Sequence, residues 1–155
     1  MRSPIFKGLA LGTALLISGC SSEPTKRYFP PQASLQQLQH LPNGQWQALV
    51  RIQNFSTGAV EFRNLSLKVQ IQAAEWTTIE ASETQKIGPN NAEIFTLGAP
   101  FGANTAQILS KGLKNTQSIG YVLKGSIESV NPSKSYPIDY QGHLNPAPGL
   151  DGVYR

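Results

Sequence analysis

The feature that most constrains this chain is an alternation of apolar and polar residues with a period of two. Four stretches show it clearly, at residues 45–53, 65–71, 119–127 and 136–144. This period places every second side chain on one face of a β-strand. In the first stretch the apolar face consists of Trp46, Ala48, Val50 and Ile52. The pattern therefore predicts half-buried strands, each with one apolar face that needs a covering layer.

Turn sequences rich in Pro, Gly, Asn and Ser separate these stretches, at 42–44, 56–58, 88–91 and 131–133. Weaker strand patterns lie at 34–39, 76–80, 84–87 and 92–97. About seven or eight short strands with such turns predict an all-β chain, a fibronectin-III/immunoglobulin-like antiparallel β-sandwich.

One short helix is predicted at residues 103–113. We expect Asn104 or Thr105 to cap it and Gly112 to help end it, while Ile108, Leu109 and Leu113 form its buried side.

Residues 1–19 have the pattern of a signal peptide. Arg2 and Lys7 supply positive charge, and residues 8–17 form an apolar run too short to span a bilayer as a helix. The run ends in Ile17-Ser18-Gly19-Cys20, which resembles the lipobox of bacterial lipoproteins, with Ile17 where Leu is usual. The resemblance implies that Cys20 is diacylated on sulfur, becomes the N-terminus and is then acylated on nitrogen.

Two other interpretations of the N-terminus are open: a secretory signal that leaves a free thiol, and an uncleaved anchor. Cys20 is the only cysteine, so no disulfide can form within the chain. The preferred division is a signal at 1–19, the acylated Cys and a flexible tether at 20–32, and a sandwich at 33–145. A Pro- and Gly-rich tail at 146–155 is expected to run along the surface.

Charge gives no sign of a nucleic-acid partner. The chain has 13 basic and 9 acidic residues, and two of the basic ones belong to the signal. The mature chain therefore keeps only a small positive excess, without the clustered basic stripe of a nucleic-acid-binding domain. Its remaining length is that of a single domain.

Three regions, in this order along the chain, resemble the strand and turn motifs of a known family. In the first, the predicted strand 46–54 ends in Asn54 and is followed by a polar turn and two segments, 60–62 and 65–69. In the second, residues 87–91 carry a Gly-Pro-Asn-Asn turn that leads into the strand pattern at 94–97. In the third, the strand pattern at 121–127 is followed by the one at 136–144. This order resembles the type-2 late embryogenesis abundant domain, also called the water-stress and hypersensitive-response domain, over residues 33–145. The resemblance implies a fibronectin-III-like sandwich and a role in tolerance of water or envelope stress. One departure is that Phe55 follows Asn54 where the family usually has Pro.

The sequence contains no catalytic set that we would assign. Gly-x-Ser-x-Gly does not occur, and His40 and His143 lie far apart without metal-ligand spacing. A metal site would need one of three acids beside the histidines, Glu61, Glu75 or Asp139. Exposed histidines are the simpler interpretation, so we expect no enzyme activity, no metal and no cofactor other than the lipid on Cys20.

Four lysines form the one basic concentration: Lys111, Lys114, Lys124 and Lys134. They could contact anionic lipid headgroups if the helix lies near the late strands. Ordinary solubility lysines are the favoured interpretation. Among the aromatic residues, Trp46, Tyr121 and Tyr136 are expected in the core, and Trp76 is the best candidate for an exposed one.

These observations predict a non-enzymatic envelope lipoprotein that binds membrane lipid through its acyl anchor. We expect it to act as a desiccation, envelope-stress or structural factor through surface binding. Ser21 stands where Asp would signal inner-membrane retention, which favours the outer membrane, facing the periplasm, in a Gram-negative cell. The alternative is an adaptor that docks an envelope protein partner through an exposed sheet edge. A metal-dependent hydrolase, with both histidines on one cleft, is a third hypothesis.

Overall fold

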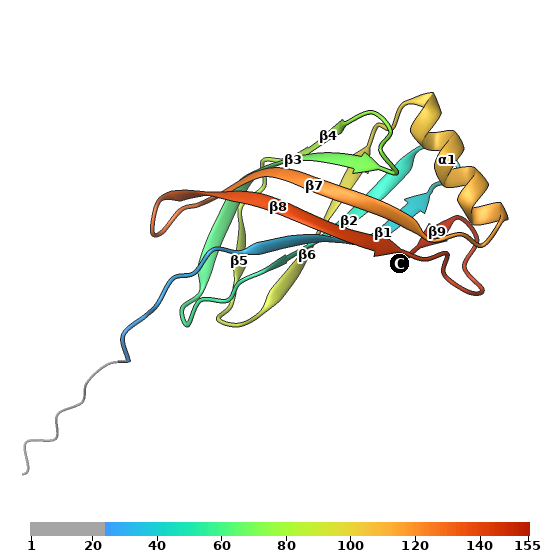
Figure 1. The fold of residues 1–155 in the computed structure, drawn as a ribbon. Coiled ribbons are helices and arrows are strands. Elements are labelled where there is room, and N and C mark those ends of the chain that lie inside the picture. The colour runs from blue at the N-terminus through green and yellow to red at the C-terminus, as the bar shows by residue number, and fades with distance from the viewer. Residues whose placement is uncertain (1–23) are drawn as a thin grey trace, which may run out of the picture.

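The computed structural model describes residues 24–155, so the predicted lipobox and Cys20 lie outside the described residues. The described chain forms two antiparallel sheets packed face to face, with one helix at one end (Figure 1). The strands are β1 (Gln32–His40), β2 (Trp46–Gln53), β3 (Val60–Ile71), β4 (Thr77–Ala81), β5 (Gln85–Ile87), β6 (Ala92–Ala99), β7 (Ile119–Ser129), β8 (Lys134–Leu144) and β9 (Val153–Tyr154), and the helix is α1 (Ala103–Lys114).

The predicted β-sandwich is confirmed. The first sheet has the order β6-β2-β1-β9, and the second has the order β4-β3-β7-β8, with β5 also paired to β3. Every predicted strand is present, with ends that differ by a few residues. Strand β3 joins two predicted segments into one, because a register shift between Arg63 and Ser66 carries the strand through Asn64, whose φ is +49°.

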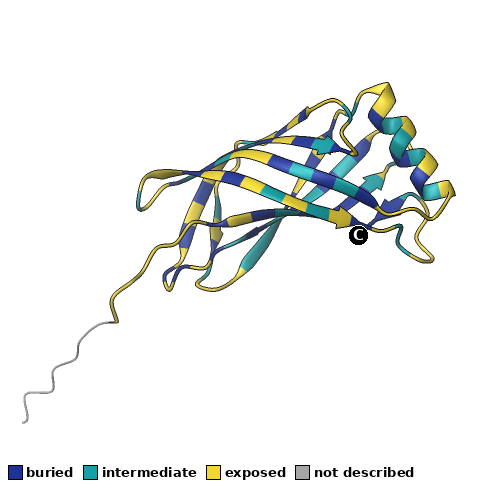
Figure 2. Ribbon diagram, viewed as in Figure 1, coloured by how far each residue is buried: buried dark blue, intermediate teal, exposed yellow. Residues whose placement is uncertain are grey.

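The core lies between the two sheets, where the alternating apolar faces meet. Buried and exposed residues alternate along the strands (Figure 2). The predicted inward face of β2 is fully or nearly fully buried, and so are the apolar positions of β3: Leu65, Leu67, Val69 and Ile71. Burying a side chain of this size contributes about 1.5–3 kcal/mol, so this interlayer contact is the main source of stability. Trp46, Tyr121 and Tyr136 are buried, and Trp76 is 44% exposed, as predicted.

Tyr121 links the two sheets through the core. From β7 its hydroxyl accepts a hydrogen bond from the backbone N–H of Leu35 in β1 (3.2 Å) and donates to the carbonyl of the same residue (3.4 Å). Burial raises the pKa of Tyr121 to about 12, and the nearby Tyr140 adds to the shift. The neutral phenol is therefore held between the sheets, with both of its hydrogen-bonding functions used.

The helix begins at Ala103, as predicted, but its predicted cap is wrong. Neither Asn104 nor Thr105 caps it; the N-cap residue is Gly102, which has no side chain to do so. Glu75, in the β3–β4 loop, does this instead: its carboxylate accepts from the Thr105 N–H (3.3 Å) and the Asn104 side-chain amide (3.1 Å). A hydrogen bond from its own backbone N–H and the bond from Asn104 lower the pKa of Glu75. A negative charge at this position also matches the helix dipole.

The expectation that the C-terminal tail runs along the surface is wrong for its last residues. Val153 and Tyr154 form β9, which pairs with Leu38 and Gln39 of β1. Tyr154 is fully buried, and its hydroxyl donates to the carbonyl of Leu109 in α1 (2.8 Å). The tail thus fastens the helix to the first sheet. Gly112 lies within the helix, which continues to Lys114, and a Cβ at this position would collide with the Tyr154 hydroxyl. This close approach explains why the position is a glycine.

At the opposite end of the sandwich, the buried side chain of Asn54 organises three segments. Its amide nitrogen donates to the carbonyls of Gly58 (3.0 Å), Ile87 (3.1 Å) and Gly88 (2.9 Å). Its side-chain oxygen accepts from the N–H of Ser56 (2.9 Å). One fully buried side chain therefore holds the β2–β3 loop against the end of β5.

The segment that precedes β1 is fastened to this same loop. The N–H of Arg27 donates to the Thr57 hydroxyl (2.8 Å), and the N–H of Thr57 donates to the Arg27 carbonyl (3.0 Å). The N–H of Phe29 donates to the Ser56 hydroxyl (3.0 Å). From Arg27 onward, the stretch predicted as flexible tether is therefore hydrogen-bonded to the sandwich.

We predict that Asn54→Ala lowers the free energy of unfolding by about 2–4 kcal/mol, because it leaves several buried backbone groups without partners. Urea denaturation of the two proteins measures the difference. The control is Asn43→Ala in the exposed β1–β2 turn, where the Asn43 side chain bonds only to Gln45. Equal losses in the two variants would contradict the role assigned to Asn54.

Candidate functional site

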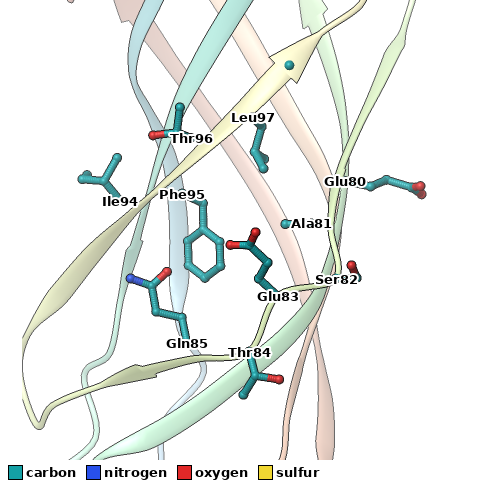
Figure 3. Close-up of a pocket in the computed structure, with 11 residues that line it drawn as sticks. Glu80, Ala81, Ser82, Glu83, Thr84, Gln85, Ile94, Phe95, Thr96 and Leu97 are labelled. Carbon is teal, nitrogen blue, oxygen red and sulfur yellow. The ribbon is translucent and has the colours of Figure 1, made fainter.

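The described surface is hollowed where the outer strands of the two sheets face each other. Residues 80–85, from the end of β4 through the β4–β5 loop, line one side of this hollow, and residues 94–98 of β6 line the other. We call it the edge groove (Figure 3). Its volume is about 630 Å³, large enough for several side chains of a bound segment.

The groove has an apolar floor and a polar rim. Phe95 and Leu97 are buried side chains that point into the space between the sheets (Figure 3). The exposed Glu83 carries its carboxylate next to the Phe95 ring, and the Gln85 side chain lies on the other side of that ring (Figure 3). Glu80 points away from the groove and accepts a hydrogen bond from the Ser66 hydroxyl (3.0 Å). Glu83 is therefore the carboxylate that a basic side chain in the groove would meet.

The backbone of β6 supplies a second set of binding groups. Strand β6 pairs with β2 alone, so its other edge has no strand partner. The Asn54 N–H donates to the Asn91 carbonyl (2.8 Å), and the register continues from Gln53 opposite Ala92. Hydrogen-bonded pairs recur at every second residue of an antiparallel ladder. The outward-facing N–H and C=O groups therefore belong to Ile94, Thr96 and Gly98.

The groove exists because the edge of the second sheet is interrupted. Strands β4 and β5 both pair with β3, but β4 ends at Ala81 and β5 begins only at Gln85. Residues 82–84, between them, pair with neither sheet. Strand β4 itself lies close to β6. The open part is thus confined to the β4–β5 loop, where an extended segment could lie along β6.

In chemical terms, the edge groove can bind an extended peptide. The free backbone groups of β6 match the hydrogen bonds of an added strand, and the apolar floor matches alternate side chains. Within residues 24–155 the ion pairs are Arg63–Glu128 (3.4 Å) and Lys124–Asp139 (3.8 Å), so Glu83 takes part in neither. A basic side chain on the bound segment would pair with it.

The structure does not bring the four predicted lysines together. Lys111 and Lys114 lie in the last turn of α1, and Lys124 lies midway along β7, beside Asp139. Lys134 lies at the start of β8, with its ammonium 5.2 Å from the centre of the Tyr136 ring. Their contact with an anionic surface stays a prediction, but it cannot involve one compact patch.

The two histidines are exposed and lie on different sheets. His40 ends β1, with its ring 5.0 Å from that of Trp46, and His143 lies in β8 opposite Gly120. Among residues 24–155, no three His, Cys, Asp or Glu side chains are grouped closely enough to hold a metal ion. In the same part of the chain, none of the helices has the length and apolar character needed to cross a membrane.

Sequence reasoning identified β6 as a strand but missed its position at an edge. Edge strands commonly carry Lys or Pro, which discourage pairing with other chains. Strand β6 has neither, and its one charged residue is Glu93. Nothing within residues 92–99 reveals which strands neighbour it, because strand order follows from contacts between distant segments.

No protein-family model matches the chain, and no curated protein matches it. Several solved structures do match the chain. A crystal structure of a protein from Archaeoglobus fulgidus is 12% identical, with a TM-score of 0.37, and the match covers 77% of this chain and 97% of that one. A solution structure from Arabidopsis thaliana is 11% identical, with a TM-score of 0.44, and the match covers 84% and 87%. A Northeast Structural Genomics Consortium target, SoR45, is 12% identical, with a TM-score of 0.42 and coverage of 84% and 92%. Likenesses of this degree carry no information on activity.

We predict that proline is tolerated at Thr96 but not at Glu93. Thr96→Pro removes an outward N–H and should change the free energy of unfolding by less than about 1 kcal/mol, whereas Glu93→Pro removes a ladder bond to Ile52 and should cost about 1–3 kcal/mol. Urea denaturation measures both. Neither side chain is fully buried, so the pair isolates the backbone effect. A greater loss at Thr96 would show that the register of the free edge is shifted.

Proposed function

We propose that this protein is a lipid-anchored lipoprotein of the bacterial cell envelope, non-enzymatic, with a sandwich of the type-2 late embryogenesis abundant kind. The observation that carries the proposal is the lipobox-like sequence ending in Cys20, followed after a few residues by a single β-sandwich. The order of the strand motifs in residues 33–145 supports the family assignment, since each motif falls on a strand or turn of this sandwich.

The proposed role is that of a desiccation, envelope-stress or structural factor that acts by binding through its surface. The edge groove supports a binding role, because it combines free backbone groups, an apolar floor and an unpaired carboxylate. Ser21 after the acylated Cys20 favours the outer membrane, facing the periplasm, if the cell is Gram-negative. The only non-protein group that this proposal requires is the covalent lipid on Cys20.

The test is the intact mass of membrane-extracted protein, beside a Cys20→Ala form. The expected mass corresponds to cleavage before Cys20 plus about three acyl chains, since multiple chains are needed for stable anchoring. The Cys20→Ala protein should lack this mass and leave the membrane fraction. A full-length or unacylated mass for the unmodified chain would overturn the anchor and the envelope address together.

A second candidate function is favoured by the free edge of β6: an adaptor subunit that holds an envelope protein by strand addition. Cross-linking in intact cells tests it with a matched pair of variants. Thr96→Pro removes an outward donor, while Thr96→Val changes the side chain and keeps the donor. An adaptor should cross-link to one stoichiometric partner in the unmodified and Val forms, and lose that partner in the Pro form. Equal capture by both variants would exclude strand addition along β6.

A further inference from the structure

The end of the sandwich from which the N-terminal segment leaves exposes three aromatic side chains. We call it the tether end and define it by residues 26–29 and the β2–β3 loop, 54–59. Tyr28 is 40% exposed, Phe29 is 45% exposed and Phe55 is 40% exposed. Among residues 24–155, six large apolar or aromatic side chains are at least 36% exposed, and three of the six belong to the tether end. Such a concentration on a small domain marks an interaction surface.

The three aromatic residues are held in place. Phe29 is bonded through its backbone N–H to the Ser56 hydroxyl, next to Phe55 in the chain. The Tyr28 and Lys26 side chains lie over Gly58, within about 3.5 Å of the position of a Cβ at that residue. Ser56 is fixed in turn by the buried Asn54 side chain. The aromatic surface is therefore part of the folded domain, and its ordering costs little when it binds.

The tether end also carries positive charge. Lys26 and Arg27 are exposed and have no ion-pair partner among the described residues. Neighbouring strand ends carry two basic and two acidic side chains, which balance: Lys86, Lys134, Glu61 and Glu93. Lys26 and Arg27 therefore leave a positive excess beside the aromatic side chains. Aromatic rings next to cations are the combination that favours a membrane–water interface with anionic headgroups.

Chain length places this surface near the proposed anchor. Arg27 follows Cys20 by seven residues. A fully extended chain covers at most about 3.3–3.6 Å per residue, so Arg27 lies at most about 25 Å from an acylated Cys20. The α1 end lies at the far end of the sandwich (Figure 1). The anchor thus holds the tether end close to the bilayer, which gives this surface a high effective concentration for binding to lipid headgroups.

We propose that the tether end docks on the bilayer surface, with Tyr28, Phe29 and Phe55 in the headgroup region and Lys26 and Arg27 on anionic lipid. This inference rests on the proposed acylation of Cys20 and goes beyond it, since an acyl anchor alone leaves the domain free to tumble. Docking sets the sandwich in one orientation, with α1 farthest from the membrane.

The experiment uses the acylated full chain in vesicles of phosphatidylcholine and phosphatidylglycerol. Ala59→Cys and Trp76→Cys each add one thiol for an environment-sensitive fluorophore, since Cys20 is the only native cysteine. Both positions are exposed, Ala59 in the β2–β3 loop and Trp76 in the β3–β4 loop, and these two loops lie at opposite ends of the sandwich (Figure 1). Ala59 belongs to the tether end but not to the proposed contact, so Tyr28, Phe29 and Phe55 all remain in the labelled protein. Docking predicts that lipid carrying bromine quenches the fluorophore at position 59 and leaves the one at position 76 bright. Dissolved iodide should quench in the reverse order.

Each outcome has a distinct meaning. If the protein floats with the vesicles while both fluorophores respond alike to lipid and to iodide, the anchor stands and docking is overturned. If the protein does not float with the vesicles, the proposed anchoring fails, and docking fails with it. A Lys26→Gln/Arg27→Gln form of the position-59 protein should lower the ratio of docked to undocked molecules by about fivefold per charge on anionic vesicles. Equal docking in that form would remove the headgroup contact from the proposal.

Discussion

The hydrogen bonds of the Asn54 side chain hold together the part of the molecule on which both proposed activities depend. Its amide joins the β2–β3 loop to the end of β5, and its oxygen fixes Ser56. Ser56 in turn holds Phe29 at the start of the domain. Because the side chain is fully buried, its partners cannot turn to water if it is lost. The backbone N–H of Asn54 also bonds to the carbonyl of Asn91, just before β6, so the tether end and the start of β6 are both held at this residue.

The opposite end is closed by contacts of a different kind. Glu75 caps α1 from the β3–β4 loop, and Tyr154 fastens the helix from β9. Each joins segments that are distant in sequence, so the helix connects the two sheets at this end. The edge groove lies between these closed ends, where β4 stops and β5 has not begun. The sandwich is therefore fixed at both ends and open along one side.

The strands could be predicted because each one carries its own signal. Alternation in 45–53, 65–71, 119–127 and 136–144 is a local property of a half-buried strand, and the burial of Trp46 follows from it. Trp76 stands outside these stretches, and its exposure is predicted on that ground. The missed features depend on contacts between distant segments. Val153–Tyr154 is too short to show a period, and its place beside β1 involves contacts with residues far away in sequence, such as that between Tyr154 and Gly112. The Glu75 cap lies far in sequence from the helix that it serves.

The same reasoning applies to the candidate sites. The lipobox-like motif is a short contiguous sequence, so it could be proposed from the sequence alone, whereas a free sheet edge depends on strand order. The tether end combines both kinds of information: residues 26–29 are polar and aromatic in sequence, but only the fold brings Phe55 beside them. Tyr28 and Phe29 could be noted from the sequence, but not the surface that they help to form.

The two proposals constrain each other through the direction of β6. This strand runs from the β5–β6 loop, which is bonded to Ser56 at the tether end, towards the segment that enters α1. A domain docked by its tether end would hold β6 across the gap between the membrane and the α1 end, with its free edge facing sideways. A partner in the same membrane would then meet that edge without the domain first losing rotational freedom, which is a large part of the cost of association. Docking would thus increase the binding of a membrane-bound partner more than that of a soluble one.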